Sequence, residues 1–89
     1  MKKKIAILVR DRKAEALRMA VGATLSNDEI SVFIMDDKLE RDDDIDLNIQ
    51  MLSDLNVNIF SNNPENPFKQ KTTAEIAVML SEYDVVIPY

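Results

Sequence analysis

The sequence predicts a single α/β domain, residues 1–89, in which a four-stranded parallel sheet lies between layers of helices. Three observations predict this class. The apolar run at residues 5–9 is continuous, as in a strand that is buried on both faces, and residues 30–35 are mostly apolar. Segments with the apolar spacing of helices alternate with the strand candidates. One glycine and three prolines in 89 residues indicate that loops are few.

The first half of the chain contains two strands and one helix. Residues 5–9 form the first strand, and residues 12–25 have a helical apolar repeat, carried by Ala14, Leu17, Val21 and Leu25. Gly22 within this helix costs up to about 1 kcal/mol relative to alanine, which indicates a place where helix and sheet pack closely. Residues 30–35 form the second strand, rich in β-branched and aromatic side chains.

The second half continues the alternation. Residues 45–55 form a helix with a broad apolar face, and Asp43 or Asp44 is its expected N-cap. Residues 57–60 form the third strand, in which Asn58 indicates a less buried place such as a sheet edge.

Residues at the start of the last helix and at the end of the last strand indicate where these two elements lie. Thr72 and Glu75 have the spacing of a capping box at the start of a helix. Residues 85–87 form the fourth strand, which lies at an edge or ends at Pro88 because proline cannot donate a ladder hydrogen bond. With the two most apolar strands at the centre, the predicted spatial order is 3-2-1-4, and the alternative order is 2-1-3-4.

Composition excludes several kinds of chemistry. The chain has no cysteine and no histidine, so it has no thiolate nucleophile, no disulfide and none of the commonest transition-metal ligands. A net charge of −5 disfavours nucleic acid as a partner. The apolar run at residues 5–9 meets charged residues too early for a signal peptide, and no stretch approaches a membrane span of about 20 residues. We therefore expect a cytoplasmic protein that uses no cofactor and binds no membrane.

Candidate ligand-binding residues follow the carboxyl ends of the strands, where open parallel sheets bind ligands. They are Arg10, Arg12, Asp36, Asp37, Asn62, Asn63 and Tyr89. The two arginines precede a helix and have the chemistry to hold a phosphate or carboxylate, although no glycine-rich phosphate motif is present. The alternative interpretation is that they are solvated or pair with Asp36, Asp37 or the terminal carboxylate.

Acidic residues gather between residues 36 and 46. Carboxylates suit Mg²⁺ or Ca²⁺, but the spacing fits no EF-hand loop. A solvated loop that places negative charge at a helix N-terminus explains the same residues. We predict no metal site and no catalytic residue. For Tyr89 we expect a role at an interface or as a cap.

Three segments of the first half are informative together: the strand of residues 4–9, the helical stretch of residues 15–20, and residues 32–36 followed by Asp37 and Leu39. These segments resemble the start of the DsrE/DsrF-like proteins, which are small sulfur-relay domains. The resemblance implies a three-layer α/β/α sandwich that assembles into oligomers through faces and edges of the sheet. It also implies a sulfur-carrying cysteine after a later strand, but residues 59–63 contain none, and Ser61 cannot replace it.

Two hypotheses for function follow from the sequence. The first is a non-catalytic DsrE-like domain that acts through homo-oligomer assembly or a protein partner, without sulfur transfer. The second is a module that binds a small anionic ligand at the carboxyl ends of the strands. A self-association interface above about 1,000 Å² would distinguish the first from the second.

Overall fold

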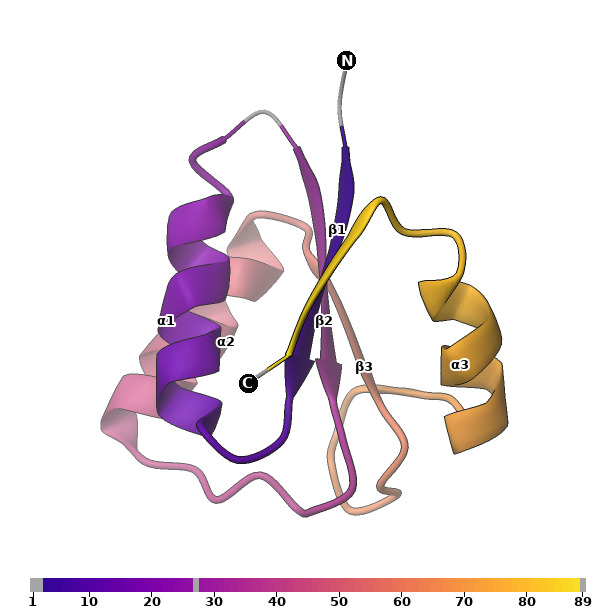
Figure 1. The fold of residues 1–89 in the computed structure, drawn as a ribbon. Helices are drawn as coiled ribbons and strands as arrows, with labels where there is room; N and C mark the ends of the chain where they lie inside the picture. The colour runs from indigo at the N-terminus through magenta and orange to yellow at the C-terminus, as the bar shows by residue number, and fades with distance from the viewer. Residues whose placement is uncertain (1–2, 27, 89) are drawn as a thin grey trace.

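The computed structural model describes residues 3–26 and 28–88, which form one alternating series of strands and helices (Figure 1). The elements are β1 (Lys4–Val9), α1 (Lys13–Ala23), β2 (Glu29–Ile34), α2 (Asp43–Asp54), β3 (Asn58–Ser61), β4 (Lys69–Gln70), α3 (Thr73–Leu80) and β5 (Val85–Pro88). All five strands are parallel, in the order β4-β3-β2-β1-β5. The order predicted for the four longer strands is thus confirmed.

The prediction of four strands was wrong, because β4 adds a fifth beside β3. This strand is only two residues long, too short for a period-two pattern to reveal, and it pairs Lys69 with Phe60. Consequently β3 lies inside the sheet, so the expectation that it forms an edge was wrong, while the less buried place expected for Asn58 is confirmed. The exposed Asn58 side chain instead accepts a hydrogen bond from Lys69 Nζ at 2.8 Å.

Helices cover both faces of the sheet (Figure 1). The connections through α1 and α2 move in one direction along the sheet, so both helices lie on the same face, and α3 returns across the other. The larger core lies under α1 and α2 and is built around Ile7, Leu17, Val32, Ile34 and Leu52. The smaller core lies under α3 and consists of Ala6, Phe33, Met35, Phe60 and Ile76.

Local signals at the helix ends were confirmed in part. The capping box of α3 is present: Thr72 Oγ1 accepts the Glu75 N–H at 3.1 Å, and Glu75 Oε1 accepts the Thr72 N–H at 3.0 Å. For α2, the predicted cap was one or two residues too late. Asp42 is the N-cap, and its carboxylate accepts the Ile45 N–H at 2.9 Å.

The interpretation of Gly22 was wrong. Gly22 is exposed, and a Cβ atom built on it would meet nothing within 4 Å. It therefore marks no close approach between α1 and the sheet. In the described part of the chain, no helix is long and apolar enough to cross a membrane.

Candidate functional site

The carboxyl ends of β1, β2 and β3 carry a network of polar side chains centred on Asp36. Directly after β2 the backbone of Asp36 is left-handed, with φ of 69°. Asn62 accepts the Asp36 N–H at 2.6 Å and donates to the Asp36 carboxylate at 3.2 Å. Asn63 donates to the Asp36 carbonyl at 2.9 Å. These bonds tie the β2–α2 loop to the end of β3.

Asn66 completes the network and was missed as a site residue by the sequence analysis. It is only 2% exposed. Its Oδ1 accepts the Leu39 N–H at 2.8 Å, and its Nδ2 donates to the Asp37 carbonyl at 3.2 Å and to Ser61 Oγ at 2.9 Å. An asparagine between two prolines signals a turn, but nothing in that pattern indicates which loop it will bind.

Cationic side chains border this network, and each forms an ion pair that is exposed on at least one side. Arg10 Nε lies 3.7 Å from Asp36 Oδ2, and Lys13 Nζ lies 4.0 Å from Asp37 Oδ2. Arg12 Nη1 instead lies 3.8 Å from Glu15 Oε2 within its own helix. Exposed pairs of this kind contribute about 0–1 kcal/mol each, so water and other ions compete easily for these groups.

The predicted site residues are thus only partly brought together. Arg10, Asp36, Asn62 and Asn63 form one connected cluster. Asp37 faces Lys13, and Arg12 pairs away from the cluster. Tyr89 lies outside the described residues.

The hydrogen bonds of this network hold two loops of the protein together. Both asparagine amides that were candidates for holding an anion donate to the protein's own oxygen atoms. Within residues 3–26 and 28–88, no three acidic residues converge as metal ligands would, and no buried side-chain polar atom lacks a hydrogen-bond partner. The polar groups at the carboxyl ends of the strands therefore serve mainly to fix the loops after β2 and β3.

The two edges of the sheet differ in chemistry. At the β4 edge, both Lys69 and Gln70 are polar and exposed, which is a common protection against strand pairing. The β5 edge instead carries Val85 and Val86, which are 38% and 39% exposed. Their register with Ile5 and Ala6 places them on opposite faces of the sheet. The β5 edge is therefore apolar on both faces.

Comparisons with known proteins give no relative that would assign a function to the polar network or to the β5 edge. No protein-family model, curated protein or solved structure is significantly similar to this chain.

Proposed function

We propose that the protein is a non-catalytic assembly domain in which two copies associate through the β5 edge. The observation that carries the proposal is the contrast between the two sheet edges. A lysine protects the β4 edge, whereas the β5 edge strand itself carries two half-exposed valines. Exposed apolar edge strands favour pairing with another chain.

A twofold arrangement suits this edge. An isologous contact places the same surface of each copy against the other, so the valines of both copies bury one another. Pro88 lacks an N–H and confines strand pairing to the residues before it. The interface must therefore gain most of its stability from apolar side chains.

The polar contacts of Ser61 agree with a domain that carries no sulfur. Its side chain is fully buried, and Oγ accepts hydrogen bonds from the Asn63 N–H at 3.1 Å and from Asn66 Nδ2 at 2.9 Å. The hydroxyl holds a loop in place. The kinship with DsrE-like proteins remains a prediction from residues 4–39, and it supports the proposal because that family assembles into oligomers.

Sedimentation equilibrium over a range of protein concentrations tests the proposal. We expect wild-type protein to associate beyond its 10.1 kDa monomer mass. Val86→Lys gives β5 the residue type that guards β4, and we expect it to sediment as a monomer. Val78→Lys is the matched control, because Val78 is an exposed valine on α3 rather than on β5. A monomeric wild-type protein, or equal association of all three, would refute the proposal.

Binding of an anion by Arg10 and Arg12 is the alternative prediction, with weaker support. The connections reverse direction between β1 and β5, which is where open α/β sheets tend to bind ligands, and both arginines follow β1. However, each arginine already pairs with a carboxylate. A thermal-shift screen of phosphates and carboxylates tests it, since ligand at 100 times its Kd adds about 2.7 kcal/mol of stability.

A further inference from the structure

The outer side of α2 carries an apolar stripe separate from its buried face. The buried side chains of this helix are Ile45, Ile49 and Leu52. A second set, spaced four residues apart, faces outward: Leu47, Met51 and Leu55, which are 59%, 39% and 53% exposed. Residues at this spacing lie on one side of a helix. We call these three residues the α2 stripe.

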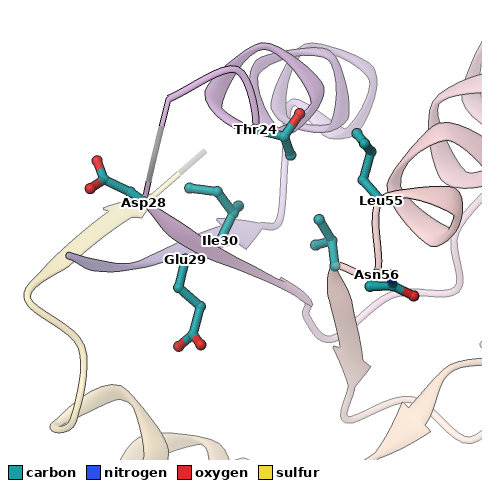
Figure 2. A pocket seen from close by; sticks show the side chains of 7 residues that line it. Thr24, Asp28, Glu29, Ile30, Leu55 and Asn56 are labelled. Atoms are coloured by element: carbon teal, nitrogen blue, oxygen red, sulfur yellow. The ribbon is translucent and has the colours of Figure 1, made fainter. Parts of the chain in front are cut away.

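A hollow continues the stripe at the C-terminal end of α2. It has a volume of about 190 Å³ and is lined by Thr24, Ile30, Leu55 and Val57, together with Asp28, Glu29 and Asn56. Figure 2 shows Thr24 from the end of α1 and Leu55 from the end of α2 above Ile30, while the Glu29 side chain points away to the other side of the sheet. The hollow therefore has room for an apolar side chain of a partner at one end of the stripe.

Negative charge borders the stripe on its own helix. Asp43 and Asp44 lie one turn before Leu47, and Asp54 lies three residues after Met51. All three are exposed, and α2 contains no basic residue. Among residues 3–26 and 28–88, the only cation paired to the helix is Arg41, which binds Asp46, a residue outside the stripe. An apolar stripe framed by carboxylates is left facing solvent.

This charge pattern selects among occupants. If a second copy docked through its own α2 in an antiparallel arrangement, Asp43 and Asp44 of one copy would approach Asp54 of the other. Like charges brought together at an interface cost several kcal/mol. Anionic lipid surfaces and nucleic acid are disfavoured by the same carboxylates. A cationic partner with an apolar face matches both features.

We propose that the α2 stripe docks an amphipathic helix of another protein, one whose apolar face is flanked by lysine and arginine. Helix-in-groove binding uses apolar anchors at the same helical spacing that the stripe presents. One anchor of the partner helix enters the hollow beside Leu55. This surface is distinct from the β5 edge, so the proposal does not depend on self-association.

Titration of a fluorescent amphipathic peptide tests the proposal. The probe is a helix of leucine, alanine and lysine with its leucines on one face. One control peptide has glutamate in place of lysine, and another has the same composition in scrambled order. We expect only the first to bind. The triple variant Leu47→Ser/Met51→Ser/Leu55→Ser should weaken its affinity by at least about tenfold, whereas Val78→Ser should not.

Charge variants on and off the stripe separate recognition by its flanking carboxylates from general attraction to an acidic protein. Asp43→Asn/Asp54→Asn should weaken binding several-fold, and Asp46→Asn should leave it unchanged. Absence of binding, equal binding of the glutamate or scrambled peptide, or an unaffected triple-serine variant would overturn the proposal. Loss of wild-type self-association in the triple variant would also overturn it, by assigning the stripe to a second copy. Val86→Lys should retain full peptide affinity, whatever its oligomeric state.

Discussion

At the scale of single residues, the buried side chain of Asn66 links two loops of the molecule. Its buried amide joins the loop after β2 to the loop after β3 through two hydrogen bonds, to the Leu39 N–H and the Asp37 carbonyl, and a third bond reaches Ser61 at the end of β3. Buried amides in such positions are costly to remove, because each abandoned donor or acceptor has lost its water as well. Deleting this side chain should therefore destabilise the fold mainly because buried backbone groups lose their hydrogen-bond partner.

We expect Asn66→Ala to lower the free energy of unfolding by about 2–3 kcal/mol, since it strands the Leu39 N–H and the Asp37 carbonyl. Urea denaturation measures the change. Asn58→Ala is the matched control, because the Asn58 side chain is exposed and accepts its hydrogen bond from an exposed lysine, and it should cost less than about 0.5 kcal/mol. Equal costs for the two variants would contradict the role given to Asn66.

Gly22 provides a prediction of opposite sign. Since open space surrounds the position of its missing Cβ atom, Gly22→Ala should stabilise the protein by about 0.5–1 kcal/mol through helix propensity alone. The reciprocal change at the exposed Ala14 of the same helix, Ala14→Gly, should destabilise it by a similar amount. Thermal unfolding of both variants measures the pair. A destabilised Gly22→Ala variant would show that the glycine has a packing role after all.

At the scale of elements, the start of α3 links stability to pH. The Thr72 backbone N–H, and then its hydroxyl, lower the pKa of Glu75 below its ordinary value of 4.5. A carboxyl group whose pKa is depressed by folding stabilises the fold above its unfolded pKa. That contribution is lost as pH falls through the folded pKa. The capping box should therefore weaken only in acid.

We expect the Glu75 carboxyl group to titrate below pH 4.5 when followed by carbon NMR. Glu75→Gln keeps an acceptor for the Thr72 N–H but cannot ionise. The stability advantage of the wild-type protein over this variant should shrink below pH 4.5 and be constant above neutral pH. An advantage that is unchanged in acid would rule out the proposed coupling.

Among the elements, those with strong local signals were predictable and the rest were not. The continuous apolar run of residues 5–9 predicted β1, the mostly apolar residues 30–35 predicted β2, and the Thr72–Glu75 pair predicted the start of α3. The two residues of β4 have no periodicity, so the position of β3 inside the sheet could not be inferred. The cap of α2 was misplaced because three aspartates in a row offer equivalent oxygen atoms, and the chain geometry selects Asp42.

The candidate site shows a different limit. Parallel pairing of the strands brings Arg10, Asp36 and Asn62 together at the carboxyl ends of the strands, and the sequence predicted that they lie close together. It could not show that Asn62 and Asn63 donate to the backbone and carboxylate of Asp36. That outcome depends on the left-handed turn at Asp36, which no residue pattern specifies.

At the scale of the whole molecule, the two cores are unequal. The helices α1 and α2 each place three buried side chains in the larger core, whereas α3 contributes one, Ile76. Phe33 anchors the smaller core by stacking on Phe60 with ring centroids 5.1 Å apart. Elements with few buried contacts open at lower free energy than the rest of a protein. The α3 layer is therefore the weaker side of the sandwich.

Native-state hydrogen exchange should reveal this inequality. We expect the amides of α3 to exchange through a partial opening, while those of β1 and β2 exchange only at the free energy of global unfolding. With increasing denaturant, the free energies of exchange of the two sets of amides should converge. Equal protection of α3 and of the central strands at low denaturant would show that the sandwich unfolds as one unit.

The pairing of β5 with β1 also determines how the molecule responds to mechanical force. These strands run side by side in the same direction, in register from Ile5 and Val85 to Leu8 and Pro88. A pull applied at Lys4 and at Pro88 in opposite directions slides one strand along the other, so the hydrogen bonds between them share the load. A pull across the same strands would open those bonds one after another. The domain should consequently resist stretching between these two points far better than peeling at its β5 edge.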